Sequence, residues 1–493
     1  MANVRKDIAT LNGPWSPEIE WYAKAILELQ KKKPNDRSSW RYLGGIHGFE
    51  KNTWLNRNII KPSDSLPPAA ELQRMWQQCQ HGGWYFLPWH RGYLAAFEAI
   101  VAKTITGLGG PQNWKLPYWN YLNATNPKSR NYPKAFVDAT MPNGAPNPLS
   151  TVPRGPAIKL GPTAWFPRDI TLASMANPRF TSPAGGLGFG GGNSGGFAHF
   201  GSVAGALEVN PHNAVHVIIG GPPAGLQTGY MYDPNLAGLD PIFWLHHCNI
   251  DRLWAAWLQR PGNIMESGAA WRNGPSPRQF AMPDVSGNLA IFTPAQTLPG
   301  GPLAPAYDDL TIGTGAGAMP ASLEAVAGEG AAMPAKMSSA APPATSLVGA
   351  NAASVSVKSA RTSSIVTLSA PAAQPAGDPV EQSVLLNLEN VRGTGASGVL
   401  NVLVGLPATA GSPAVEPTLV DTVALFGLAN ATAKRGKHAG NGITLVVDIS
   451  ALAKTLAGEG DLDRLEVHLE QPGDHEKTEI TVGRISVYHQ PIE

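Results

Sequence analysis

Apolar positions recur with helical spacing through the first 300 residues of the chain. A first helix is predicted over residues 67–83 from apolar side chains at i, i+3, i+4 and i+7: Leu72, Met75, Trp76 and Cys79. Further helices are expected from Pro88, Asn210–Pro211 and Asp240–Pro241, since Asn and Asp cap helices and proline fits the first turn. Four such helices predict a bundle, which can hold metals between its facing helices. The glycine-rich segment 185–196 is expected to be an irregular surface loop.

The pattern changes near residue 300. Residues 301–354 are rich in Ala, Gly, Pro and Ser, with one weakly helical piece at 321–328, and predict a linker or lid. Residues 355–493 contain about six short β-branched segments separated by turn residues, which is typical of a small antiparallel sandwich or barrel. The predicted fold is therefore α + β, with a mainly helical domain at 1–300 followed by a β domain.

Composition and charge narrow the function classes. The chain has 493 residues, a net charge of +1 and two cysteines, so neither nucleic acid nor an anionic membrane is expected as a partner and no disulfide framework is present. No apolar run of about 18 residues and no N-terminal apolar leader region are found. We expect a soluble, cytoplasmic protein, with a removed leader or export by a carrier protein left open.

Histidines supply the candidate chemistry, because eight of the twelve fall before residue 250. His212 and His216 are spaced i, i+4 and can chelate one ion, whereas only one of the adjacent His246 and His247 can face the same point. His47, His81 and His90 supply a second possible group upstream. Imidazole suits copper, zinc, iron and nickel, and no carboxylate or cysteine cluster competes.

Two long motifs resemble those of a known family. HGGWYFLPWHRGYLAAFE at 81–98 and DPIFWLHHCNID at 240–251 are similar to the two copper signatures of tyrosinases and polyphenol oxidases, which are type-3 dicopper proteins. The resemblance covers roughly residues 35–260. It implies two copper ions, bound by two sets of three histidines: His47, His81 and His90, and His212, His216 and His247.

The resemblance also orders the remaining histidines. The family pattern places the ligand four residues before Asp251, which is His247, and His247 also lies on the apolar helical stripe of Phe243 and Trp254. His246 is then expected to pack behind the ligands, and His199 to be structural. Arg91, Glu98 and Asp251 belong to the signatures and are expected to be structural as well.

The implied activity is ortho-hydroxylation of monophenols and oxidation of o-diphenols to o-quinones with O2. A phenol has a pKa near 10, so a base is needed. The resemblance assigns that role to Glu208 and Asn213, which would hold a proton-accepting water. Taken alone, Glu208 is a solvated residue before a helix and Asn213 a first-turn cap.

Cys79 precedes His81 by two residues. By itself it predicts core packing, and the resemblance adds a thioether to His81, which would fix the orientation of that ring. Cys248 is expected to be a buried thiol, and a Cys79–Cys248 disulfide is the less favoured alternative in a reducing compartment.

Other readings stay open at this point. They are a catechol oxidase or o-aminophenol oxidase without monophenol activity, a hemocyanin-like oxygen-binding protein, and a structural protein without metal. The β domain resembles the one that keeps some polyphenol oxidases latent until it is cleaved off, with the cut expected within 301–354; a plain stabilising or oligomerising domain is the alternative. Homo-oligomers and a copper-delivery protein are further partners to consider beside the phenol and O2.

Overall fold

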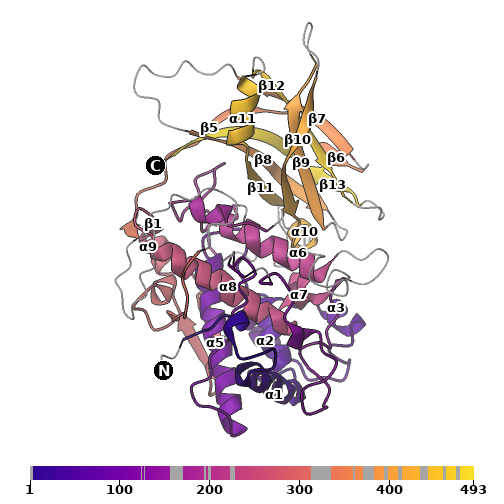
Figure 1. Cartoon of the computed structure of the whole chain (residues 1–493), viewed down its shortest axis with the longest axis vertical. Coiled ribbons are helices and arrows are strands. Elements are labelled where there is room, and N and C mark those ends of the chain that lie inside the picture. The colour runs from indigo at the N-terminus through magenta and orange to yellow at the C-terminus, as the bar shows by residue number, and fades with distance from the viewer. Residues whose placement is uncertain are drawn as a thin grey trace.

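A computed structural model gives the fold of the chain. The structure describes residues 4–123, 125–126, 128–155, 170–193, 196–197, 201, 203–221, 228–312, 335–358, 361–369, 382–393, 398–408, 414–433, 442–458, 462–472 and 478–492. A helical domain carries the N-terminal part of the chain and a sheet domain the C-terminal part (Figure 1). The predicted α + β two-domain fold is therefore confirmed. His199 and the helix expected at 321–328 lie outside the described residues.

The helical domain is built around long, buried helices. Its elements are α1 (Pro17–Lys31), α2 (Trp40–His47), α3 (Lys51–Asn56), α4 (Ala69–Met75), α5 (Phe86–Gly107), a π-helical turn (Glu208–Asn213), α6 (Ala214–Gly220), α7 (Pro234–Ala237), α8 (Pro241–Leu258), α9 (Ala269–Arg272) and the short strands β1 (Ile264–Glu266), β2 (Phe280–Pro283) and β3 (Leu289–Phe292). Within the described ranges, no helix has both the length and the apolar character needed to cross a lipid bilayer.

Two of the predicted helices form as their sequences indicate. Helix α8 begins at Pro241, where the amide of Ile242 donates a 3.0 Å hydrogen bond to the Asp240 carboxylate. Helix α5 begins two residues before the expected start. The two helices pack through the rings of Phe97 and Trp244, which stack with centroids 3.5 Å apart at an angle of 8°, so α5 and α8 form the centre of the helical core.

The helix predicted over 67–83 is shorter than expected and ends at Met75. Beyond it the amides of Gln77 and Gln78 donate to the carbonyls of Gly45 and Ile46 in α2, each over 3.0 Å. These bonds between segments replace further helical turns and carry the chain toward the end of α2. The bundle around the site therefore uses α2, α5, α6 and α8 rather than α4.

The glycine-rich segment 185–196 is not simply a surface loop. Residues 188–192 are buried, and the Phe189 ring stacks on Trp257 of α8 with centroids 4.6 Å apart at 12°. Glycines predicted an irregular path correctly, but the aromatic residue among them anchors that path in the core.

The described residues of the C-terminal domain form one antiparallel sheet of ten strands that does not close into a barrel. Its elements are β5 (Ser346–Ala350), β6 (Val355–Val357), β7 (Arg361–Leu368), β8 (Gln382–Gly393), β9 (Val399–Leu406), β10 (Val415–Ala424), α10 (Leu428–Thr432), β11 (Ile443–Asp448), α11 (Ser450–Ala457), β12 (Arg464–Glu470), β13 (Ile480–Val482) and β14 (Arg484–Pro491). The strand order is β10-β9-β12-β7-β5-β14-β8-β13-β6, and β11 pairs with β8. Alternation is clear in β12, where every second residue is buried.

The sheet begins inside the range assigned to the linker, because β5 pairs with β14 at the other end of the domain. A short strand β4 (Lys336–Ser338) precedes it and pairs in parallel with β1 of the helical domain. Within the segment 301–354, β4 is thus attached to the helical domain and β5 to the sheet domain.

The sheet domain lies over one end of the helical domain (Figure 1). There Nδ2 of Asn235 in α7 lies 3.5 Å from Oδ1 of Asn430 in α10. Strand β10 approaches α6 and the Glu208–Asn213 turn. Farther along the interface, Gln490 of β14 pairs with the main chain of Leu187, accepting from its amide over 2.7 Å and donating to its carbonyl over 2.8 Å. Contacts from β10 and β14 thereby hold the sheet domain against the helical domain.

Candidate dinuclear metal site

Three of the predicted ligands form a compact buried group. His47 is the last residue of α2, His81 lies between α4 and α5, and His90 lies in α5. Their ring centroids are separated by 5.4 Å (His47–His81), 5.8 Å (His47–His90) and 5.6 Å (His81–His90). The three rings are therefore close neighbours, and His47 has a ligand atom within 4.8 Å of one from His81 in one group and of one from His90 in another.

Hydrogen bonds orient these rings. Nδ1 of His47 lies 2.8 Å from the Pro234 carbonyl, and Nδ1 of His90 lies 2.8 Å from the Phe86 carbonyl. A carbonyl only accepts, so each Nδ1 carries the proton and each Nε2 keeps its lone pair. Both of these Nε2 atoms are buried and have no hydrogen-bond partner in the described protein, as expected of atoms that bind a metal.

The second group comes from the π-helical turn, α6 and α8. The Nε2 atoms of His212 and His216 each lie 3.3 Å from Nε2 of His247. Nδ1 of His212 donates to Oδ1 of Asn213 over 2.9 Å, and Nδ1 of His216 donates to the Met231 carbonyl over 2.8 Å. The Nε2 atoms of His212, His216 and His247 therefore converge on one point.

The two groups face each other. The rings of His90 and His247 stack with centroids 4.4 Å apart at 13°, and one ligand atom each from His47, His90 and His247 lies within 4.8 Å of the others. Two ions bound to these groups would be neighbours, which is the arrangement of a dinuclear centre.

Burial keeps the imidazoles neutral. It lowers the pKa of His47 to about 4 and that of His212 to about 3. Burial likewise holds the pKa of His90, His216 and His247 well below the usual value, and neighbouring histidines add to the effect. Neutral imidazole is the form that binds metal, so the site needs no proton loss near pH 7. The donor set of nitrogens alone suits copper.

The Nδ1 atom of His246 faces Tyr121 and not the point where the nitrogens of His212, His216 and His247 converge. Its Nδ1 lies 3.1 Å from the Tyr121 hydroxyl, and its ring stacks on His212 with centroids 5.4 Å apart at 21°. One of its ring nitrogens nevertheless lies within 4.8 Å of ligand atoms of His212, His216 and His247. The side chain therefore packs directly against the second group.

Glu208 and Asn213 line the same small pocket of about 30 Å³. Oε1 of Glu208 accepts a 2.7 Å hydrogen bond from the Gly82 amide. Burial raises the pKa of Glu208 to about 8, although the amides of Gly82 and Gly83 lower it. Its Oε2 is buried without a hydrogen-bond partner in the described protein. A carboxylate with such a pKa can exchange a proton near neutral pH.

The sheet domain closes this pocket with Phe426, which follows β10. The Phe426 ring stacks on His216 with centroids 4.2 Å apart at 20°, and it lies 5.7 Å from His81 and 5.8 Å from His212. The side chain is 3% exposed. Sequence reasoning missed this residue; the only local signal is an aromatic residue that interrupts the alternation at the end of a strand.

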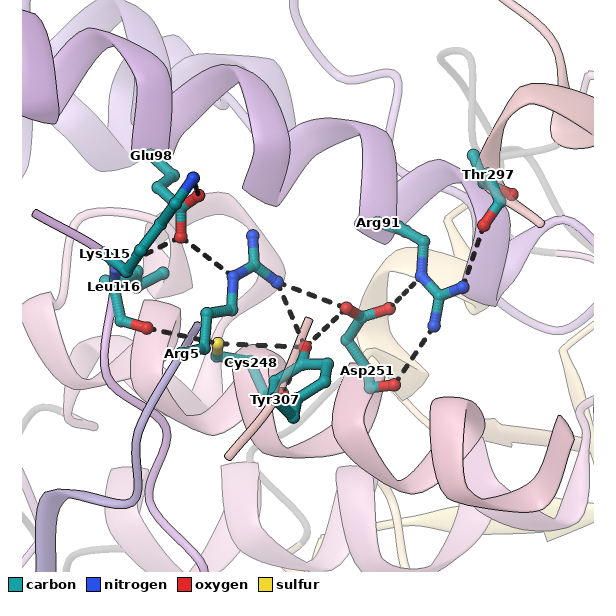
Figure 2. Close-up of polar contacts among 9 residues, drawn as sticks. All are labelled: Arg5, Arg91, Glu98, Lys115, Leu116, Cys248, Asp251, Thr297 and Tyr307. Atoms are coloured by element: carbon teal, nitrogen blue, oxygen red, sulfur yellow. Dashed lines mark hydrogen bonds and ion pairs between the residues drawn. The ribbon is translucent and has the colours of Figure 1, made fainter. Parts of the chain in front are cut away.

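Signature residues outside the histidines form a buried ion-pair network (Figure 2). Arg91 of α5 donates to the Asp251 carboxylate of α8 and, over 2.8 Å, to the Thr297 carbonyl. Arg5 bridges Asp251 (3.2 Å) and Glu98 (2.8 Å). The network joins α5 and α8 one helical turn from His247, so it holds the two ligand-bearing helices in register.

Arg5 and Tyr307 contribute side chains to the network and were not predicted. Arg5 comes from the N-terminal segment, and the hydroxyl of Tyr307 donates to Asp251 over 2.5 Å. Neither residue is near a motif in sequence, and no periodic signal marks them. Cys248 is a buried thiol, as expected, and no disulfide joins it to Cys79. Its sulfur lies 3.9 Å from the Tyr307 hydroxyl.

Cys79 lies beside His81, with its sulfur 3.3 Å from Nδ1 of that histidine. The side chain is fully buried, and burial raises the pKa of the thiol well above its usual value. The thiol is thus placed next to the His81 ring and is protonated in this environment.

A helical bundle that buries two facing groups of histidine side chains defines a protein with a histidine-rich site that can bind metal. The family model described as the common central domain of tyrosinase matches residues 37–260, and a model for a domain of unknown function matches residues 344–490. The tyrosinase HcTyr1 of Hahella sp. (strain CCB-MM4) is 32% identical over 514 residues, covering 96% of this chain and 97% of that protein. The chain therefore belongs to the tyrosinase family, whose members are copper oxidoreductases.

More distant matches also carry the names polyphenol oxidase and tyrosinase. Polyphenol oxidase 3 of Agaricus bisporus is 28% identical over 295 residues, covering 48% of this chain and 47% of that one. The solved structure of latent apple tyrosinase superposes with a TM-score of 0.61 at 17% identity, covering 99% of this chain and 97% of that one. This last similarity extends the shared fold to the sheet domain.

Proposed function

We propose that the chain is a tyrosinase that hydroxylates monophenols to o-diphenols and oxidises these to o-quinones with O2. The observation that carries this proposal is the pocket in which Glu208 and Asn213 lie beside the ligand His81. A pure diphenol oxidase has less need of a base, whereas a monophenol must lose a proton with a pKa near 10.

Two copper ions would occupy the two histidine groups. His47, His81 and His90 hold one ion, and His212, His216 and His247 hold the other. When bound, the copper pair supplies the activation of O2 and accepts electrons from the phenol. The protein's own contribution is to bury and orient six imidazoles, which shields them from water.

Glu208 provides the proton acceptor. Gly82 fixes one carboxylate oxygen, which leaves Oε2 to take a proton through a water that the Asn213 amide also holds. The Asn213 oxygen is engaged by His212, so its Nδ2 is the group directed at the water. The substrate phenol then enters as phenolate, the form that binds a cationic metal centre.

The intact chain is latent in this proposal, because Phe426 covers the second histidine group. Substrate must displace a buried aromatic ring, which costs about 1.5–3 kcal/mol of apolar burial, before it can reach His216. Release of the sheet domain removes that cost.

The described contacts narrow where an activating cut can fall. Arg252 of α8 donates to the carbonyls of Asp309 (3.2 Å) and Thr311 (3.1 Å), so the chain up to Thr311 is part of the helical domain. A cut between Thr311 and β5 frees the sheet domain and keeps these bonds, whereas a cut before Tyr307 would remove a member of the ion-pair network.

Oxygen uptake by copper-loaded protein after such a cut tests the proposal. Wild-type enzyme is expected to consume O2 with both a monophenol and an o-diphenol. Glu208→Gln keeps the shape and removes the base, so the monophenol rate should fall by about 10²–10⁴-fold and the diphenol rate much less. Diphenol activity alone in the wild type would make the protein a catechol oxidase, and none with either substrate would favour an oxygen carrier.

A thioether between Cys79 and His81 is a further part of the proposal. Its formation would replace the S–H and the ring Cε1–H with a C–S bond, and O2 would take up the two electrons and two protons to give hydrogen peroxide. Intact-mass measurement of copper-loaded protein should then show the loss of two hydrogen atoms, and Cys79→Ser should not show it. An unshifted mass in wild-type protein would leave Cys79 as a packing residue.

A further inference from the structure

Five residues that line the pocket, Gly201, Ala204, Glu208, Val209 and Asn213, come from a stretch of sequence that is almost free of charge. In the sequence from residue 180 to 232 the only acidic residue is Glu208, and there is no lysine or arginine. Over the whole chain 15% of residues are charged, so a stretch of this length would ordinarily carry several. This stretch supplies the proposed base, Glu208, and the side of the pocket that we call the wall, which consists of Gly201, Ala204 and Val209.

The wall itself is built from small residues. Gly201, Ala204 and Val209 line the pocket beside Glu208. Gly201 is in close contact with the His81–Gly82 backbone: a Cβ added there would lie 2.2 Å from the Gly82 carbonyl oxygen. A larger side chain cannot be accommodated at this point, and the described lining residues present no cation to a substrate.

The side chains that the sheet domain contributes to the pocket are uncharged, like those of the wall. Besides Phe426, the sheet domain contributes Ile443, Thr444 and Leu445 of β11 to the lining. The sheet-domain side of the pocket is therefore formed by an aromatic ring that stacks on His216 and by three uncharged residues of β11. None of these four residues is charged, and their chemistry indicates what the wall accepts.

We infer that the opened pocket selects phenols whose ring substituent is uncharged and apolar, and that it discriminates against substituents with a carboxylate. This inference rests on the proposed phenol oxidase function and names the substrate class within it. A carboxylate beside the wall loses water without gaining a cationic partner, which is costly.

The test compares two diphenols of nearly equal shape, 4-propylcatechol and 3-(3,4-dihydroxyphenyl)propionate, on the copper-loaded full-length chain. The ratio of their kcat/KM values does not depend on the fraction of molecules that are open, so latency does not affect it. We expect at least a 10-fold preference for the neutral catechol. A ratio within threefold of one, or a preference for the carboxylate, would overturn the inference. Failure to oxidise either compound would instead refute the proposed function.

A charge added to the wall checks the cause. Ala204→Lys is expected to move the ratio at least fivefold toward the carboxylate substrate, and Ala204→Gln, which adds a polar chain without charge, should leave the preference on the neutral side. If the lysine variant does not fold, Val209→Lys places the cation on the same wall. A ratio that does not respond to the cation in a folded variant would show that the wall does not set the preference.

Discussion

Replacement of His247 with alanine is expected to abolish oxygen uptake and to leave the protein with about one copper ion per chain. His247 contacts both histidine groups. Its Nε2 lies 3.3 Å from the Nε2 atoms of His212 and His216, and its ring stacks on His90 of the other group. Loss of one of three imidazoles removes several kcal/mol of metal binding, and about 4 kcal/mol corresponds to a 10³-fold loss of rate.

The adjacent His246 supplies the matched control. It is equally buried in α8 and its removal leaves a cavity of the same kind, but its Nδ1 is engaged by Tyr121. His246→Ala should retain two copper ions, with activity reduced by about 10–100-fold at most, the range for residues that orient ligands. Copper analysis and circular dichroism of both variants would measure this. Two ions in His247→Ala and one in His246→Ala would transfer the ligand assignment to His246.

The histidine groups could be predicted from sequence because their signals are local. His90 and His247 lie on long helices whose caps and apolar stripes are encoded within a few residues. His212 and His216 share a helical face through their i, i+4 spacing. What local spacing could not show is the approach of His81 to His47, which depends on Gln77 and the following residue leaving the helix to bond α2.

Contacts between distant segments account for most of what the sequence did not reveal. Arg5 and Tyr307 meet Asp251 from the two ends of the helical domain (Figure 2), and no short pattern encodes such a meeting. In the sheet domain, β-branched segments predicted about six strands, whereas the described residues form ten. The strands that were not predicted are β6, β7 and β5, the last a short strand of Ser, Gly and Ala with two larger apolar residues that is completed by pairing with β14. Phe426 was missed for the same reason, since its partner His216 lies about 210 residues earlier.

Replacement of Phe426 with alanine is expected to raise the activity of the uncut chain by about 10–100-fold. The ring is 3% exposed and stacks on His216, so its truncation removes about 1.5–3 kcal/mol that favours the closed arrangement. Because 1.4 kcal/mol is a factor of ten in an equilibrium, the open population rises by one to two orders of magnitude. The remaining interface, including the Gln490–Leu187 pair, keeps the domains associated.

The measurement is the rate of catechol oxidation before and after the linker is cut, in copper-loaded wild-type protein, in Phe426→Ala and in a control. Leu419→Ala is suited to the control, because Leu419 lies on the same strand β10 and is 43% exposed; it should stay as latent as the wild type. After cleavage all three should reach similar rates, since the residue at 426 leaves with the sheet domain. If Phe426→Ala remains latent until cleavage, the barrier lies in the docking of the whole domain and not in this ring. Equal activity of all three before and after the cut would mean that the sheet domain does not restrain the site.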